Sequence, residues 1–318
     1  MCLISFLQRF VMNGILGISL SQLSIMFAFM LIGFVLVRLK KIPDNTATVT
    51  SQLIYWVFIP ALTFNTMAAN VSLSQIGGKL EYFFAGIATV AFALVLAYML
   101  QKRFGNDRLV RAVLMYSVVF SNFGYLGYPV IRGIYGEEMM CNVMIMCVPY
   151  NVVVFSWAVP LLSGKKFSGV KDLLTPAMVG LLAGIAAGLL QIRLPDAVTS
   201  ILSMAGDCMA PCAMLLAGCV LARCSLRELF GYKAVYYTAA LRLLIIPLFY
   251  LAVMNLIGLD KDLIRAVVLI SALPFGINTI VFPEANGQHS PLGASCCIIA
   301  TLLSFITVPF VCQLIEHF

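Results

Sequence analysis

The chain has 318 residues, of which 62% are hydrophobic and only 10% are charged, and its formal net charge is +7. An ordinary soluble domain carries roughly 25% charged residues, so the composition excludes a soluble globular protein and predicts a membrane protein. Basic loops between membrane spans account for the positive charge, and nucleic acid is not expected as a partner. The sequence contains no P-loop, GxSxG or HExxH motif, and we expect neither an enzyme nor a bound cofactor.

Long apolar segments follow one another along the whole chain. A helix needs about 20 mostly apolar residues to cross the hydrocarbon layer of a membrane, and ten such segments are separated by charges and by Gly/Pro clusters. They cover residues 22–39, 49–69, 81–101, 111–135, 142–162, 175–192, 198–222, 234–258, 263–284 and 291–315. Residues 1–17 have no basic region ahead of their apolar run, so a cleaved signal peptide is not expected. They are interpreted as an interfacial lead-in, or Met12 is the start of translation.

Most of the 20 Lys and Arg residues fall in alternate loops, and positive charge is retained on the cytoplasmic side of a membrane. The basic set of loops, predicted to be cytoplasmic, holds Arg38, Lys40, Lys41, Lys102, Arg103, Arg108, Arg111, Lys165, Lys166, Lys171, Arg223, Arg227 and Lys233. The opposite set holds Arg9, Lys79, Arg132, Arg193, Lys261 and Arg265. We therefore predict a multi-pass protein of the cell membrane, surrounded by lipid, with both termini outside.

Three landmarks recur at a nearly constant spacing. KKIPDN (40–45) matches IRLPDA (192–197) 152 residues later, Pro60 matches Pro211 at 151, and Pro160 matches Pro309 at 149. Each copy then holds five spans, and an odd number requires the second copy to enter the membrane from the opposite face. The sequence predicts an all-α membrane protein of ten transmembrane helices in two inverted five-helix repeats, which is the architecture of secondary transporters.

The fourth and ninth spans both contain helix breakers near their middles, SNFGYLGYPV (121–130) and ALPFGINTIVF (272–282). Proline removes a backbone donor, and unwound backbone within a membrane is tolerated only where protein buries it or where it lines a cavity. We therefore predict that spans four and nine are broken and form a binding site, with the amides of Asn122 and Asn278 beside the breaks. The alternative is a pair of packing kinks in which each asparagine caps a helix end.

These two stretches resemble the auxin efflux carrier family. The motifs that carry the likeness are Asn122, Gly127-Tyr128-Pro129 and Tyr135-Gly136 in span four, Ala272-Leu273-Pro274, Gly276 and Asn278 in span nine, Pro211 to Gly218 in span seven, and LRLLIIPL (241–248) in span eight. The resemblance implies that spans four and nine cross at their broken midpoints. It also implies a transport domain of spans three to five and eight to ten that moves against a scaffold of spans one, two, six and seven, with the scaffold forming a homodimer.

Two departures from the plant auxin exporters limit the analogy. This chain has Ser121 where they have proline before the asparagine, and its two halves, 1–164 and 175–318, are joined only by residues 165–174. It resembles the short bacterial branch. The implied substrates are small organic anions, such as dicarboxylates or indole acids. The predicted binding residues are Ser121, Asn122, Gly124, Gly127, Pro129, Pro274, Gly276 and Asn278.

Two further function classes compete with an organic-anion carrier. A sodium symporter similar to the bile acid carriers would have a similar crossover and would use the amides and hydroxyls of spans four and nine as ligands. A membrane receptor would carry a signalling domain, and the sequence offers none.

Ionisable residues within spans are functional candidates because they are costly there. Asp207 could carry a coupling proton or bind a cation if burial raises its pKa, or it could form a structural ion pair or cap. Arg242 could attract an anion or extend to the membrane interface.

Glu284 and His289 are interpreted as solvated or gating residues. The Cys208/Cys212 pair could be drawn as a Cu(I) site, but we predict no metal.

Overall fold

The computed structural model describes residues 15–73, 80–163, 174–288 and 290–317, and within these ranges it is helical with one isolated β-bridge. Residues 1–14 of the predicted lead-in, most of the linker and His289 lie outside the described residues, and residues 15–17 belong to the first helix. The first half contains α2 (Ile15–Arg38), α3 (Thr46–Leu53), η1 (Ile54–Phe58), α4 (Ile59–Asn70), α6 (Leu80–Leu100), η2 (Gln101–Phe104), α7 (Arg108–Val119), η3 (Phe123–Gly127), α8 (Tyr128–Val153), η4 (Val154–Ala158) and α9 (Val159–Ser163). The second half contains α11 (Pro176–Leu189), α12 (Asp196–Asp207), α13 (Met209–Arg223), α14 (Leu226–Phe230), α15 (Lys233–Ala240), η5 (Leu241–Ile245), α16 (Ile246–Ile257), α17 (Lys261–Ala272), α18 (Asn278–Ala285) and α19 (Pro291–His317).

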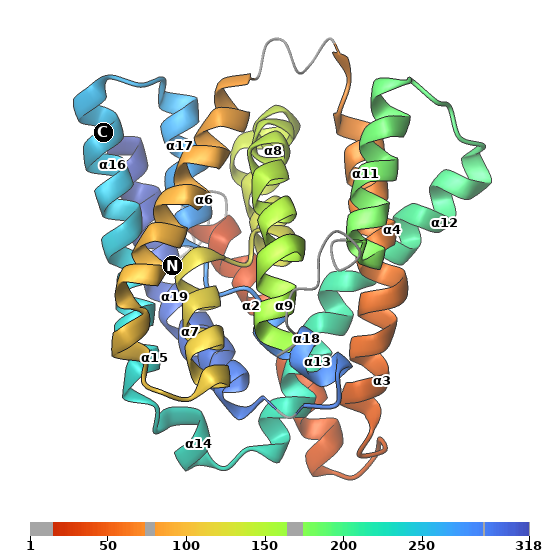
Figure 1. Ribbon diagram of the computed structural model, residues 1–318, viewed down its shortest axis with the longest axis vertical. Helices are drawn as coiled ribbons and strands as arrows, with labels where there is room; N and C mark the ends of the chain where they lie inside the picture. The colour runs from red at the N-terminus through yellow and green to blue at the C-terminus, as the bar shows by residue number, and fades with distance from the viewer. Residues whose placement is uncertain (1–14, 74–79, 164–173, 289, 318) are drawn as a thin grey trace, which may run out of the picture.

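Most helices run along the long axis of the molecule (Figure 1), and in the described residues seven continuous helical stretches are long and apolar enough to span a membrane. These seven coincide with the predicted spans one, two, three, five, seven, eight and ten. The other three predicted spans, four, six and nine, are not single long helices. Span six is the 14-residue helix α11, and spans four and nine are each divided between two helices.

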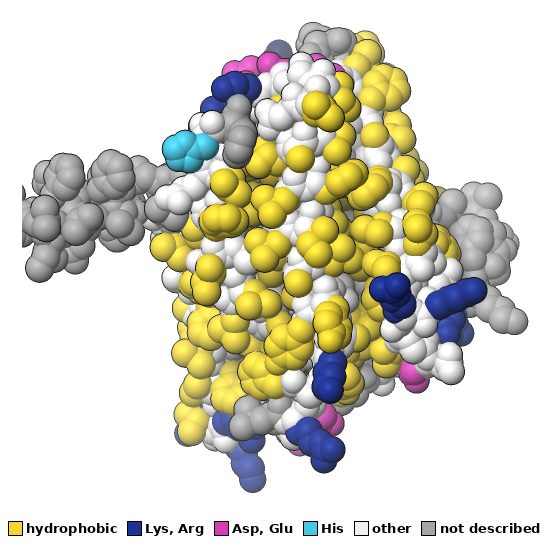
Figure 2. All heavy atoms as spheres, turned by 90° about the vertical axis from the view of Figure 1, so that its left-hand side faces the viewer, with side chains coloured by type: hydrophobic (Ala, Val, Ile, Leu, Met, Phe, Trp, Pro, Cys, Tyr) yellow, Lys and Arg dark blue, Asp and Glu magenta, His cyan; other side chains and the backbone are white. Residues whose placement is uncertain are grey.

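Large apolar side chains are exposed along α6, α15 and α16, among them Phe84, Val95, Tyr237 and Leu256. Figure 2 shows this face as a broad apolar surface, with charged side chains mostly towards its two ends. An apolar band of this kind fits contact with lipid rather than with water.

Four π-helical turns widen the long helices, and each is followed two positions later by a proline. Pro60 follows η1, Pro129 follows η3, Pro160 follows η4 and Pro247 follows η5. A proline has no N–H and its ring clashes with the carbonyl four residues earlier, so an α-helix cannot continue unchanged through it. The residue just before each proline instead donates to the carbonyl five residues back, which keeps the backbone hydrogen-bonded in lipid.

Backbone conformation repeats between the two halves of the chain. Among the described residues, those with a positive φ form three pairs: Lys40 with Gln191, Gly105 with Gly258, and Gly136 with Gly287. The members of each pair are 151, 153 and 151 residues apart, close to the spacing of the sequence landmarks. Gly136, at φ 85°, divides α8 so that Tyr128–Tyr135 completes span four and the rest belongs to span five.

Small residues set the closest helix contacts. Gly180, Gly184 and Gly188 form a stripe on α11 that lies against the backbone of α4, and Gly33 of α2 and Gly218 of α13 lie against each other's helices. Lipid tails are as apolar as the helices, so association in a membrane depends on such close packing. Helices α2, α4, α11, α12 and α13 consequently form one packed group. The helices α6 to α9, α15 to α17 and α19 pack mainly among themselves, whereas α18 packs against α3 and α13 as well as against α9 and α19.

We predict that Gly184→Ala lowers the thermal stability of the protein. The added Cβ would lie 2.5 Å from the carbonyl oxygen of Phe64, and overpacking against backbone costs about 1–3 kcal/mol. That cost exceeds the roughly 1 kcal/mol that alanine gains over glycine in helix propensity. The measurement is the melting temperature of purified protein in detergent. Ala183→Val, which enlarges an exposed position of the same helix, is the control and should leave the melting temperature unchanged.

Candidate functional site

The broken midpoints of spans four and nine meet and pair with each other. Ser121 and Phe275 form an antiparallel β-bridge. The N–H of Asn122 donates to the carbonyl of Pro274 at 2.7 Å, and the N–H of Gly276 donates to the carbonyl of Phe120 at 3.3 Å. We call residues 120–122 and 274–276 the crossing. Each extended segment satisfies backbone groups that the other could not satisfy in lipid.

The crossing directs two helix beginnings and two helix ends towards one region. Helices α7 and α17 end there, and η3 and α18 begin there. Helix beginnings carry a partial positive charge and helix ends a partial negative charge. The region is therefore strongly polarised although no acidic side chain belongs to the crossing.

Three buried side-chain oxygens at the crossing have no hydrogen-bond donor: Ser121 Oγ, Asn122 Oδ1 and Asn278 Oδ1. Asn122 occupies the N-cap position of η3 without making a side-chain cap, and α18 likewise has no side-chain cap. The alternative in which each asparagine caps a broken end is therefore wrong. Instead, Asn278 Nδ2 donates to the hydroxyl of Tyr116 at 2.9 Å. A buried polar atom without a partner is costly, and these oxygens are available to a ligand.

Arg242 neutralises one of the two helix ends. Its side chain is 1% exposed, and Nη1 donates to the carbonyl of Val118, in the last turn of α7, at 3.2 Å. The interpretation that Arg242 extends to the membrane interface is wrong. Its Nε and Nη2 atoms are buried without a hydrogen-bond partner, and the guanidinium interacts electrostatically with Tyr150, Tyr250 and Tyr116. A cation at a helix end is favourable, so the guanidinium offsets the partial negative charge at the end of α7.

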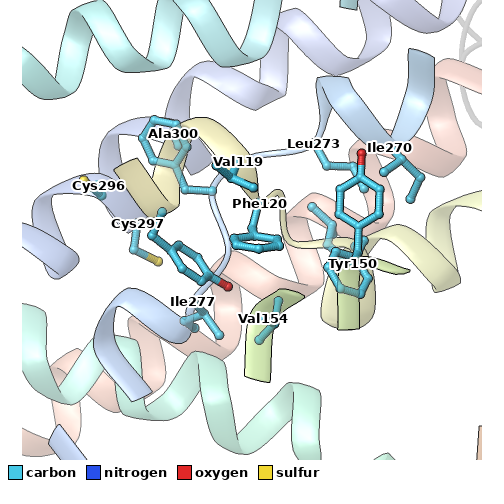
Figure 3. Packing of buried hydrophobic residues seen from close by; sticks show 14 of the residues in the cluster. Val119, Phe120, Tyr150, Val154, Ile270, Leu273, Ile277, Cys296, Cys297 and Ala300 are labelled. Atoms are coloured by element: carbon cyan, nitrogen blue, oxygen red, sulfur yellow. The ribbon is translucent and has the colours of Figure 1, made fainter. Parts of the chain in front are cut away.

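Apolar side chains surround the other faces of the crossing (Figure 3). Phe120 is fully buried, with its ring centroid 4.9 Å from that of Tyr116 and 6.3 Å from that of Tyr150. Leu273 and Ile277 come from the opposite strand of the crossing and belong to the same core. This packing excludes water from one side of the crossing, which leaves a single polar side.

A small cavity of about 60 Å3 lies on that polar side. Five of the predicted binding residues line it: Ser121, Asn122, Gly124, Gly276 and Asn278. Gly127 and Pro274 do not line it, because Gly127 is packed under Leu273 and the carbonyl of Pro274 accepts from Asn122. The side chain of Pro129, the second residue of α8, is not among those described. The opposite wall is formed by residues of α4, chiefly Ile59, Leu62, Thr63, Thr66 and Met67, and by Met209 of α13.

A larger cavity of about 730 Å3, which we call the vestibule, adjoins the first and shares part of its lining with it. Polar residues line part of the vestibule, namely Gln22, Asn65, Asn70, Arg132 and Asp207 among others. Asp207 is exposed rather than buried. The burial on which the proton-carrier hypothesis rested is therefore absent, and Asp207 does not reach the crossing cavity.

Sequence reasoning missed three features of the site. Tyr116, Tyr128 and Asn151 line the crossing cavity, but nothing in the local sequence distinguishes them from other polar residues in spans. Glu284 is 3% exposed and forms an ion pair with Arg223, so its interpretation as a solvated residue is wrong. The charge of Arg242 was visible within its span, yet its contact with α7 depends on tertiary packing.

Comparison with known proteins gives one consistent result. A family model described as "Membrane transport protein" matches residues 18–166 and 160–312. An uncharacterized transporter of Methanothermobacter thermautotrophicus is 24% identical over 283 residues, which is 88% of this chain and 92% of that protein. An uncharacterized transporter of Methanocaldococcus jannaschii is 25% identical over 300 residues, covering 89% of this chain and 94% of its own.

We predict that Gly276→Ala destabilises the protein and that Gly124→Ala does not. A Cβ at Gly276 would lie 2.8 Å from the hydroxyl of Tyr116, which is fully packed, whereas a Cβ at Gly124 would meet nothing within 4 Å. The expected cost at Gly276 is about 1–3 kcal/mol, read as a lower melting temperature. Equal melting temperatures for the two alanine variants would contradict the described crossing.

Proposed function

Because the chain belongs to the auxin efflux carrier family of membrane transport proteins, we propose that it is a secondary transporter that moves small organic anions by alternating access. The observation that carries the proposal is the convergence of two helix beginnings and the asparagine amides on one cavity, with the buried guanidinium of Arg242 bound to the end of α7 at the same crossing. Helix beginnings bind anions because their N–H groups and dipoles point at the ligand. The carboxylate of a substrate would bind there.

The proposed architecture is ten transmembrane helices in two inverted repeats, with spans four and nine crossing. The paired positive-φ residues at offsets of 151 to 153 support the repeat. The close packing of α2, α4, α11, α12 and α13 supports a scaffold of spans one, two, six and seven. The transport domain, residues of spans three to five and eight to ten, would move against it in an elevator-like motion, with the scaffold forming a homodimer and both termini outside.

The position of the crossing cavity also favours alternating access. One wall belongs to the proposed transport domain and the other, from α4 and α13, to the proposed scaffold. A site at the interface of two parts can open to one side or the other when the parts move. With no Walker motif in the sequence, the substrate gradient, the membrane potential or a co-transported ion would drive the movement.

The size of the cavity constrains the substrate. A volume of about 60 Å3 holds a few water molecules at roughly 10–15 Å3 each. It therefore suits a carboxylate group rather than a whole metabolite. The rest of the substrate would extend into the vestibule, whose amides and charged groups suit a second polar group. This favours dicarboxylates such as malonate or malate over indole acids.

A sodium symporter is the second candidate, and the three unpartnered oxygens at the crossing favour it, since alkali and alkaline-earth cations prefer oxygen ligands. Against it stands the charge of Arg242, whose guanidinium binds the carbonyl of Val118, three residues before Ser121, and would repel a cation at the crossing. We therefore rank organic-anion transport first.

We expect Asn122→Ala and Asn278→Ala to lower uptake of labelled malonate or malate into proteoliposomes at least tenfold. The Nδ2 atom of each amide would donate to the substrate carboxylate, and a hydrogen bond to a charged group is worth about 1.5–3 kcal/mol. Asn255→Ala is the control, because the Asn255 amide donates to the carbonyl of Leu251 within α16 and lies outside the cavity. Full uptake and unchanged affinity in both crossing variants would rule out the proposed site.

We expect Arg242→Met to abolish anion uptake without lowering the melting temperature. A buried charge with one hydrogen bond is costly, and apolar replacements of buried charges are often neutral or stabilising. A variant that melts as the parent does but no longer takes up malate would assign Arg242 to function. If Arg242→Met instead transported normally, the guanidinium would not be needed for anion binding.

An imposed sodium gradient distinguishes organic-anion transport without sodium coupling from sodium symport. An organic-anion carrier without sodium coupling should take up malate at the same rate with sodium or with potassium outside the proteoliposomes. Uptake that rises several-fold with inward sodium would establish the symporter instead.

A further inference from the structure

The lower end of α18 in Figure 1 is fastened to the helices of the proposed scaffold. Glu284 of α18 pairs with Arg223, the last residue of α13, at 4.0 Å, and Arg223 also donates to the carbonyl of Asp44. The amide of Gln52, on α3, donates to the carbonyl of Ala285 at 3.2 Å. The carboxylate of Glu284 is almost fully buried at this junction. These contacts close the lower end between the two packed groups.

The two groups are separated towards the other end by the vestibule. The last residues of α4 and residues on either side of Gly136 line it, so it extends from the crossing away from α14. Asp207, the last residue of α12, lines it from the scaffold side, and Arg132 of α8 lines it from the side of the crossing. The described conformation is therefore closed at one end and open at the other.

The charges at the two ends are arranged in opposite senses. At the closed end the base, Arg223, belongs to α13 and the acid, Glu284, belongs to the half-helix that follows the crossing. At the open end the acid, Asp207, belongs to α12 and the base, Arg132, belongs to the other half-helix that follows the crossing. The repeat offset of 151 places Arg132 next to the counterpart of Glu284. At each of these two places the acid and the base belong to different packed groups.

We propose that two ion pairs alternate during transport: Arg223–Glu284 closes one side of the membrane in the described conformation, and Arg132–Asp207 forms and closes the other side when the first pair separates. This inference rests on the alternating-access function proposed above. The second pair compensates for the loss of the first, so that neither conformation is far more stable than the other. A transporter needs such a balance, since a large difference would trap it in one conformation.

The reaction of a cysteine in the vestibule with a membrane-impermeant maleimide reports which end is open. Ala69 is exposed and lines the vestibule, so the Ala69→Cys variant, purified in lipid nanodiscs, provides the reporter, and the parent protein gives the background rate of the other cysteines. Closing the vestibule should slow this reaction. The readout does not require transport or a known substrate.

We expect Glu284→Gln to slow labelling at least threefold, because breaking the lower pair favours the conformation with a closed vestibule. Adding Asp207→Asn should restore the parental rate, since the second pair can no longer form. Exchanging the charges, with Arg132→Asp and Asp207→Arg together in the Glu284→Gln protein, should slow labelling again. Asp262→Asn is the control, because Asp262 pairs with Arg265 at 2.8 Å within α17 and bridges no two parts.

An unchanged labelling rate in Glu284→Gln, or a slow rate that Asp207→Asn does not reverse, would overturn the alternating pairs. Each variant is first compared with the parent by size-exclusion chromatography, and the charge exchange tests the pair in a protein that keeps both charges. If no labelled acid is taken up by the parent while the labelling rates shift as expected, the organic-anion function fails and the alternating pairs stand.

Discussion

The structure depends on one constraint, which is that peptide groups within a membrane must be hydrogen-bonded by protein. Two helices broken by proline and glycine would each leave donors and acceptors exposed to lipid. The crossing solves this by pairing the breaks, so that Asn122 donates to Pro274 and Gly276 donates to Phe120. Neither break is stable without the other. The two halves of the chain are thereby tied together at the point where the candidate site lies.

The pairing at the crossing does not satisfy every buried polar group, and a ligand can bind to the groups that are left without partners. Ser121, Asn122 and Asn278 keep buried oxygens without donors, and Arg242 keeps two nitrogen atoms without acceptors. Folding alone would favour apolar side chains at these positions. Proteins commonly accept such local costs at binding sites, where a ligand makes the missing interactions. The unpaired oxygens are acceptors and suit hydroxyl or water donors, while the Nδ2 atoms of the two amides can donate to a carboxylate.

The sequence was sufficient to predict the positions of the long helices and of both breaks, because apolar runs, Gly and Pro act over a few residues. Five of the eight predicted binding residues line the crossing cavity for the same reason. The contact of Arg242 with Val118 could not be predicted, since it joins residues 124 positions apart. Glu284 is buried although the sequence suggested a solvated residue, and Asp207 is exposed although burial was considered for it. Both outcomes depend on how the two packed groups meet. The π-helical turns also escaped prediction, although a proline follows every one of the four.

The two halves share backbone conformation but not charge, and the difference gives the site its polarity. The repeat offsets of 149 to 153 place the counterpart of Arg242 between residues 89 and 93, where the chain reads TVAFA and carries no charge. The end of α7 therefore has a buried guanidinium, while the corresponding end of α17 has none. A symmetric crossing would offer equal positive and negative helix ends and no net preference for an anion. With one negative end neutralised by Arg242, the two positive helix beginnings prevail, and the proposed preference for an anion would follow from this difference between the two halves.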